Sequence, residues 1–259
     1  MPDKRRQEGL QRDLSPSGEV FEPLIAFRPD APLVDCRREA DLLRRYAHAG
    51  LPHVYAELPG SLGLVLELVR GPSLSQRLAR AERLRTEEIF AVYDGLLVTL
   101  AFLHSQGVVH RDIKPSNIML TGEPTALHAV KLIDWGLASR IDSLSHADKL
   151  TRSGTPIGTP LYMSPEHCQG RGIQQASAVY CLGLVLFEML SGQPAFAGTT
   201  PVDVMMKQLT QPLPYWTATD KSERLLYNQA RRMTCKDSLL RPAISTLRDE
   251  LRTHRPSPA

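Results

Sequence analysis

The sequence predicts an α+β fold that combines apolar helices with short strands. Residues 86–106 repeat apolar side chains with a helical period, and Cys181 lies within a second apolar helix. Short apolar runs at 108–109, 118–120 and 130–133 are interpreted as strands. The chain has 259 residues, enough for one two-part domain with a substantial core in its larger part.

Residues 86–106 are expected to form a long helix. Its apolar positions follow a period close to 3.6 residues and are Ile89, Tyr93, Leu96, Leu97, Leu100 and Leu103. Thr86 is expected to cap the start, where Glu87 and Glu88 suit the positive end of the helix dipole. Gly107 is expected to end the helix.

Two short stretches carry the residues that are expected to perform chemistry. Residues 110–117 read His-Arg-Asp-Ile-Lys-Pro-Ser-Asn, and residues 134–136 read Asp-Trp-Gly. These groups can orient a hydroxyl, neutralise a moving phosphoryl group and hold magnesium. The alternative is an ordinary domain with incidental charges. Against it, the charged residues interrupt the apolar runs at the spacing that phosphoryl transfer requires.

Further motifs follow in order along the chain. They are 38–43 (Arg-Glu-Ala-Asp-Leu-Leu), 64–69 (Leu-Val-Leu-Glu-Leu-Val), 71–74 (Gly-Pro-Ser-Leu), 158–166 (Gly-Thr-Pro-Leu-Tyr-Met-Ser-Pro-Glu), 179–190 and Arg241 with Pro242. With these motifs, the chain from about residue 36 to about residue 251 resembles a eukaryotic-type protein kinase domain of the serine/threonine class. The resemblance implies a two-lobed α+β fold with a reduced, strand-rich small lobe and a mainly helical large lobe.

The resemblance implies a role for each polar residue of the two chemical stretches. Asp112 would accept or orient the proton of the substrate hydroxyl, and Lys114 would steady the transferring phosphate. Asn117 and Asp134 would hold Mg²⁺ beside ATP, since that ion prefers hard oxygen ligands. Trp135 replaces the usual phenylalanine and is expected to fill the same apolar slot.

The resemblance also implies where ATP would lie. The backbone of residues 67–69 would meet the adenine, with Leu66 as the gatekeeper side chain. The expected nucleotide-binding positions are Gly18, Val20, Leu66, Glu67, Val69 and Met119.

Arg111, next to Asp112, suggests control by phosphorylation of the activation segment. An arginine in this place would receive the phosphate through charge-assisted hydrogen bonds. Thr155 is the first candidate for modification by an upstream kinase or by the chain itself, ahead of Thr151 and Ser153. The alternative is that these three are ordinary polar residues of a loop.

The small lobe departs from the family pattern. Residues 18–21 resemble only the tail of the glycine-rich loop, and Asp13 stands where an earlier glycine is expected, which is unfavourable on steric and charge grounds. Ile25 stands where the resemblance places a lysine, which leaves Glu39 without its usual partner. A reduced lobe and a missing part of the domain are both compatible with these departures.

Two features of the large lobe concern its framework. Glu166, which ends the Ser-Pro-Glu motif, is expected to pair with Arg241. Ala178 stands where the family has an aspartate that accepts hydrogen bonds from the strained backbone of the catalytic loop. Water or Ser177 could substitute for that carboxylate, or the contact could be lost.

Composition argues against several other classes of protein. Apolar residues make up 42% of the chain and charged residues 23%, as in a soluble globular protein. The net charge is +3 with dispersed basic residues, so neither nucleic acid nor membrane insertion is expected. No apolar run reaches the roughly 20 residues that span a bilayer, and no secretory signal is visible. The four cysteines lack the spacing of a metal site, and the cytoplasm is the expected location.

The expected organisation is a loose segment over 1–17, a small lobe over 18–69, a large lobe over 70–252 and a tail over 253–259. A kinase that phosphorylates serine or threonine in a protein or peptide is the favoured function, because the four polar residues of the chemical stretches all persist. A pseudokinase that acts as a binding or scaffolding module is the alternative, in view of the eroded small lobe. A small-molecule phosphotransferase is the third, although residues 158–166 resemble a peptide-docking platform.

Overall fold

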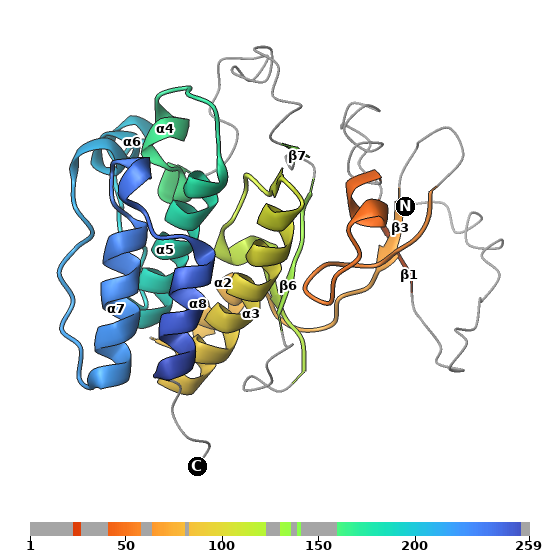
Figure 1. Cartoon of the computed structure of the whole chain (residues 1–259), viewed down its shortest axis with the longest axis horizontal. Coiled ribbons are helices and arrows are strands. Elements are labelled where there is room, and N and C mark those ends of the chain that lie inside the picture. The colour runs from red at the N-terminus through yellow and green to blue at the C-terminus, as the bar shows by residue number, and fades with distance from the viewer. Residues whose placement is uncertain are drawn as a thin grey trace, which may run out of the picture.

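The structure is a computed structural model of the whole chain, and it describes residues 23–26, 41–57, 64–80, 83–122, 130–135, 139–140 and 160–254. Figure 1 shows a strand-rich part with β1 and β3 on one side and helices α5 to α8 on the other, with β6 and β7 between them. The predicted α+β fold, with a small strand-rich lobe and a larger helical lobe, is confirmed.

The small lobe contains one antiparallel sheet. Its strands are β1 (Pro23–Ala26), β2 (Val54–Glu57) and β3 (Leu64–Glu67). β3 is central in the order β1-β3-β2, and Ile25 lies opposite Val65 in the register of β1 with β3. Residues 41–45 are helical, and Leu42 and Leu43 are buried in the hydrophobic core. The strand expected at the lysine position is therefore present, as β1.

Within the described residues, the large lobe holds α2 to α8 and four short strands. Its α-helices are α2 (Leu74–Arg80), α3 (Thr86–Ser105), α4 (Pro165–Cys168), α5 (Gln175–Ser191), α6 (Pro201–Thr210), α7 (Lys221–Met233) and α8 (Ile244–Thr253). Its 3-10 turns are η3 (Pro115–Asn117), η6 (Pro160–Tyr162) and η7 (Ser238–Leu240). Its strands are β4 (Val108–Val109), β5 (Ile118–Leu120), β6 (Val130–Leu132) and β7 (Ser139–Arg140).

The six apolar positions predicted for the α3 helix are all buried, which confirms the predicted face. The prediction that Thr86 caps the helix is wrong. Arg85 is the N-cap residue, and its backbone N–H donates to the Glu88 carboxylate at 3.2 Å. At the other end, Gln106 is the C-cap and Gly107 follows with φ of 69°, a left-handed conformation that glycine favours.

By length and composition α3 could cross a membrane, but 67% of its most apolar stretch is buried inside this molecule. α5 is a second buried helix, with core residues on all its faces from Val179 to Leu190. Gly183 lets α7 approach α5 closely, because a Cβ there would lie 2.8 Å from the Cβ of Met233. The buried helices α3 and α5 therefore form the centre of the large lobe.

Two short antiparallel strand pairs bring the chemical stretches together. β4 pairs with β7, and β5 pairs with β6 so that Ile118 lies opposite Leu132. Residues 110–117 thus run from β4 to β5, and Asp134 follows β6. The Ile133 N–H donates to the Asn117 carbonyl at 2.9 Å, which joins the two stretches at their ends.

Candidate active site

The loop after β4 is built around a buried histidine. The His110 ring accepts the Asp112 N–H at Nδ1 (3.3 Å), and its Nε2 lies 3.1 Å from the Ile133 carbonyl. A carbonyl only accepts and an amide N–H only donates, so these contacts require the neutral ring with its proton on Nε2. Burial lowers the pKa of His110 to about 4, although the carboxylates of Asp112 and Asp134 act in the opposite direction. The ring thus holds the loop while Arg111 takes a left-handed φ of 70°.

Asp112 is the meeting point of the loop's polar side chains. Lys114 donates to its Oδ2 at 2.6 Å, and the Asn117 amide donates to the same oxygen at 2.9 Å. The Asn117 amide also donates to the Asp112 backbone carbonyl at 2.9 Å, which fixes the amide's orientation. Among the described residues no bond is made to Oδ1 of Asp112, whose side chain is 20% exposed. One oxygen is therefore held in place while the other is available to a substrate.

Asn117 and Asp134 present oxygens that suit a hard cation. Both donor contacts of Asn117 use its amide nitrogen, so its Oδ1 faces the other way, where the Ser116 hydroxyl lies 3.4 Å away. Asp134 is the residue after Ile133, whose N–H donates to the Asn117 carbonyl, and its backbone takes a left-handed φ of 66°. Among the described residues no three His, Cys, Asp or Glu side chains cluster to hold a metal. This pair would leave coordination positions to phosphate and water, as Mg²⁺ prefers.

Trp135, next to Asp134, is part of the core. Its side chain is 1% exposed, and its Nε1–H donates to the Leu132 carbonyl at 3.0 Å. Its ring packs edge to face against the His110 ring, with the ring centroids 4.8 Å apart. The expectation that the indole fills an apolar slot is confirmed, and its polar N–H is satisfied.

The segment after β3 packs tightly onto β5. The Leu120 N–H donates to the Pro72 carbonyl at 2.9 Å, and Ser73 forms a bridge with Met119. Gly71 has a φ of 134°, and a Cβ there would lie 1.8 Å from the Leu120 carbonyl oxygen. Only glycine fits this approach, so Gly71 seats the expected nucleotide-binding residue Met119 beside the segment that follows Val69.

Glu67, at the end of β3, forms an ion pair with Lys131 of β6. Its carboxylate lies 2.6 Å from the Lys131 ammonium and accepts the His53 N–H at 3.1 Å. Lys131 also donates to the Leu51 carbonyl at 3.2 Å. β3, which continues from Leu66 into the expected nucleotide-binding segment, is thereby tied to β6, which leads to Asp134.

The expected partnership of Glu166 and Arg241 is present. Arg241 donates to both Glu166 oxygens at 2.7 and 2.9 Å, and the Ser177 hydroxyl donates to Oε1 at 2.6 Å. Burial alone would raise the pKa of Glu166, but these donors outweigh it and lower the pKa to about 2. Arg241 also donates to backbone carbonyls at Cys235 and Ala176, so a single guanidinium joins α4, α5 and the loop after α7.

The comparison with known families agrees with this geometry. Residues 30–251 match the protein kinase domain family. The chain belongs to the protein kinase family. Members of this family use ATP and Mg²⁺ and act on proteins.

Several bacterial protein kinases are similar to this kinase chain. It is 35% identical to the serine/threonine-protein kinase pkn3 of Myxococcus xanthus over 155 residues, covering 60% of this chain and 28% of the relative. It is 39% identical to PkaB of Streptomyces coelicolor over 160 residues, 59% of this chain and 37% of the relative. It is 35% identical to PknB of Mycobacterium tuberculosis over 185 residues, 69% of this chain and 29% of the relative. The chain thus spans about a third of the length of these relatives.

The kinase match begins after the departures of the small lobe. Strand β1, with Ile25, lies before residue 30. Gly18, Val20 and Glu39 lie outside the described residues, and so does Thr155 with the rest of residues 141–159. Their expected roles stay predictions.

Ser177 does not replace the aspartate that kinases carry at position 178. Its hydroxyl donates to Glu166 and accepts the Gln174 N–H at 3.1 Å, and neither bond reaches the catalytic loop. Ala178 is buried and has no polar side chain. Within the described residues, two side chains bond the backbone of Asp112: the His110 ring at its N–H and the Asn117 amide at its carbonyl.

Sequence reasoning missed three residues near the kinase site. The first is His110, whose ring bonds the Asp112 N–H and the Ile133 carbonyl. Apart from its place in the motif, nothing in the neighbouring sequence indicates this role. Lys131 had a usable signal, since a lysine between buried Val130 and Leu132 must point to the opposite face of the strand. His167 on α4 lies close enough to Asp112 and Arg111 to respond to their charges, although burial is the main cause that lowers its pKa.

Proposed function

We propose that this protein kinase domain transfers the terminal phosphoryl group of ATP to a serine or threonine hydroxyl of a protein. The observation that carries the proposal is the convergence of Lys114 and Asn117 on a single oxygen of Asp112. This arrangement orients the carboxylate without consuming its second oxygen, which suits a group that receives a proton from a bound hydroxyl.

In the proposed reaction the substrate hydroxyl donates its hydrogen bond to Oδ1 of Asp112. The hydroxyl oxygen forms a bond to the terminal phosphorus while the bond from that phosphorus to the bridging oxygen breaks, so ADP leaves with the electron pair. The hydroxyl proton passes to Asp112. Lys114 lies 2.6 Å from the same carboxylate and offsets the negative charge that gathers where the phosphoryl group moves.

Asn117 and Asp134 are the residues that would hold magnesium. The ion would supply positive charge to the phosphate oxygens of ATP. The two side chains would fix its place relative to Asp112, because Asn117 bonds both the Asp112 side chain and, through its carbonyl, the residue before Asp134.

The test is radiolabel transfer from ATP to peptides that differ only in carrying serine, threonine or tyrosine. Asp112→Asn should lower transfer on the order of 10³-fold, since it removes the proton acceptor but keeps the size of the side chain. Asp249→Asn, at an exposed acid on α8, is the matched control and should keep full activity. Equal transfer by the two variants would refute the role of Asp112.

A second candidate function, a pseudokinase that acts as a binding module, is favoured by the isoleucine at position 25 of β1. A thermal-shift titration with ATP, with and without Mg²⁺, separates the two, because a ligand that binds only the folded state raises the midpoint. A midpoint that rises without phosphate transfer to any peptide supports the pseudokinase. A small-molecule phosphotransferase would label none of the peptides but would consume ATP with a low-molecular-weight acceptor.

Control by phosphorylation at Thr155, received by Arg111, is also proposed from the sequence, together with a cytoplasmic location. Arg111 directly precedes Asp112, so a phosphate bound there would act on the catalytic loop. Intact-mass analysis after incubation with ATP and Mg²⁺ should show added phosphate that Thr155→Ala removes. An unmodified but active protein would contradict this control.

A further inference from the structure

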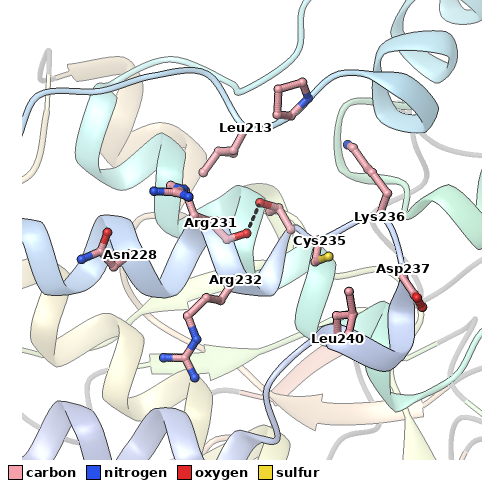
Figure 2. A pocket seen from close by; sticks show the side chains of 10 residues that line it. Leu213, Asn228, Arg231, Arg232, Cys235, Lys236, Asp237 and Leu240 are labelled. Atoms are coloured by element: carbon pink, nitrogen blue, oxygen red, sulfur yellow. Dashed lines mark hydrogen bonds between the residues drawn. The ribbon is translucent and has the colours of Figure 1, made fainter.

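Helix α7 lies on the side of the large lobe away from the small-lobe sheet (Figure 1), and residues at its end line a hollow. This hollow lies between the segment that precedes this helix and the loop that follows it, and has a volume of about 790 Å³. In Figure 2, Leu213 lies on one side of the hollow and Leu240 on the other, with Arg231 and Lys236 at opposite edges. We call this surface the α7 groove.

The α7 groove has an excess of positive charge. Arg231, Arg232 and Lys236 line it, against one carboxylate, that of Asp237. Glu250 neutralises Arg232 through contacts of 2.7 and 2.9 Å. In the part of the chain that the structure describes, no carboxylate lies within ion-pair distance of Arg231 or Lys236.

The helix dipole explains only part of this charge. Arg231 and Arg232 lie in the last turn of α7, where cations complement the helix carbonyls. Lys236 lies beyond the helix, half-buried, with its ammonium donating to the Tyr180 hydroxyl at 2.7 Å and lying over the Phe196 ring at 4.7 Å. Burial and the nearby Arg241 guanidinium lower the pKa of Lys236 to about 8, and no carboxylate of the described residues compensates its charge. An anion in the groove would supply that compensation.

Large apolar side chains are exposed around the same groove. Leu240 is 69% exposed and its neighbour Leu239 is 90% exposed. On the segment before α7, Tyr215 is 85% exposed, although the adjacent Pro214 carbonyl is held by the Tyr227 hydroxyl at 3.0 Å. Apolar side chains presented on a fixed backbone beside cations are typical of a protein interaction surface.

We propose that the α7 groove binds a short acidic segment of a partner protein, with carboxylates on Arg231 and Lys236 and an apolar side chain on Leu240. Charge complementarity selects an acidic occupant. The exposed Leu239 and Tyr215 extend the surface beyond the hollow itself, which favours a peptide over a small anion. The groove is separate from the catalytic loop, so binding does not require kinase activity.

The test is fluorescence anisotropy with the full chain and a labelled peptide of alternating glutamate and leucine, in the absence of ATP. Binding should saturate, and Arg231→Gln and Leu240→Ser should each weaken it about fivefold, the order expected for one partly exposed contact. Arg80→Gln is the matched control for charge, since Arg80 is an exposed arginine in the last turn of α2. Val202→Ser is the matched control for apolar exposure, since Val202 is 67% exposed. Both controls should bind as the parent does.

Four results would overturn the proposal. The first is equal binding of the same peptide with glutamine in place of glutamate. The second is variants that bind no differently from their controls, with circular dichroism showing that all are folded. The third is full competition by inorganic tripolyphosphate with no effect of Leu240→Ser, which would assign the groove to a small anion. The fourth is a concentration-dependent dimer in sedimentation that Leu240→Ser abolishes, which would assign the groove to a second copy of the chain.

Discussion

The catalytic loop of the large lobe and strand β1 of the small lobe both occupy places where protein kinases handle phosphate, yet they differ in what they carry. In the loop, Lys114 and Asn117 are both present and both bonded to Asp112. In β1 the backbone pairs with β3, but Ile25 stands where the family resemblance places a lysine. Strand pairing depends on backbone groups, whereas phosphate binding depends on one side chain, so the first can persist without the second.

The largest expected effect comes from breaking the frame of the large lobe. Arg241→Ala should lower the free energy of unfolding by about 3–5 kcal/mol, because it leaves the Glu166 carboxylate without its partner in a mostly buried place. Urea unfolding followed by circular dichroism measures this. Arg171→Ala, at an exposed arginine, is the control and should change little. A loss below about 1 kcal/mol for Arg241→Ala would contradict the bracing role of the pair.

Acid should weaken the large lobe through its buried histidines. Burial lowers the pKa of His110 and of His104 from 6.5 to about 4, so the unfolded chain binds more protons between these values. The free energy of unfolding is therefore unaffected by these histidines above about pH 6.5. It decreases as the pH falls to about 4, by up to roughly 3 kcal/mol for each histidine. Unfolding free energies measured across this range give the slope.

Two variants, one in each lobe, test which histidines cause the dependence of the unfolding free energy on pH. His104→Leu should flatten the slope, because it removes one of the groups whose pKa burial lowers. His53→Gln, at an exposed histidine of the small lobe, is the matched control. Identical slopes for both variants and the parent would show that His104 does not contribute to acid sensitivity.

Restoring the lysine tests the small lobe directly. Ile25→Lys should raise the rate of phosphate transfer about tenfold at subsaturating ATP, the order expected for one charge-assisted contact to phosphate. Ile25→Met, which adds length without charge, is the control and should not raise it. An unchanged rate for Ile25→Lys would mean that the small lobe lacks more than this one side chain.

The smallest expected effect concerns the tie between the lobes. A double-mutant cycle on Glu67→Gln and Lys131→Gln should give a coupling energy of about 1 kcal/mol, since the pair is mostly shielded from solvent. The more exposed pair of Asp203 and Lys207 on α6 is the control, with an expected coupling of about 0.3–0.5 kcal/mol. Coupling no larger than in the control would show that the contact between Glu67 and Lys131 does not stabilise the arrangement of β3 and β6.

The apolar face of α3, the buried helix α5 and the short strands around the loop could all be predicted, because each depends on residues close together in the sequence. The prediction that α3 begins at Thr86 is confirmed, but its cap was predicted wrongly. Thr86 is a favourable cap type, but it is the first helical residue, and the return contact of Glu88 to the Arg85 backbone makes Arg85 the N-cap. The alternative that Ser177 replaces the missing aspartate could not be excluded from sequence, because it depends on where the Glu166 carboxylate lies.

Sequence by itself determined the class of fold and the four polar residues expected in the active site, since helical periodicity and motif spacing are local properties of a chain. Only the tertiary structure decided that Lys114 and Asn117 share one oxygen of Asp112. It also decided that Glu67 meets Lys131 across 64 positions and that Arg231, Lys236 and Leu240 border one groove. Such contacts depend on the path of the backbone between distant segments, which the packing of the whole core selects and no short stretch encodes.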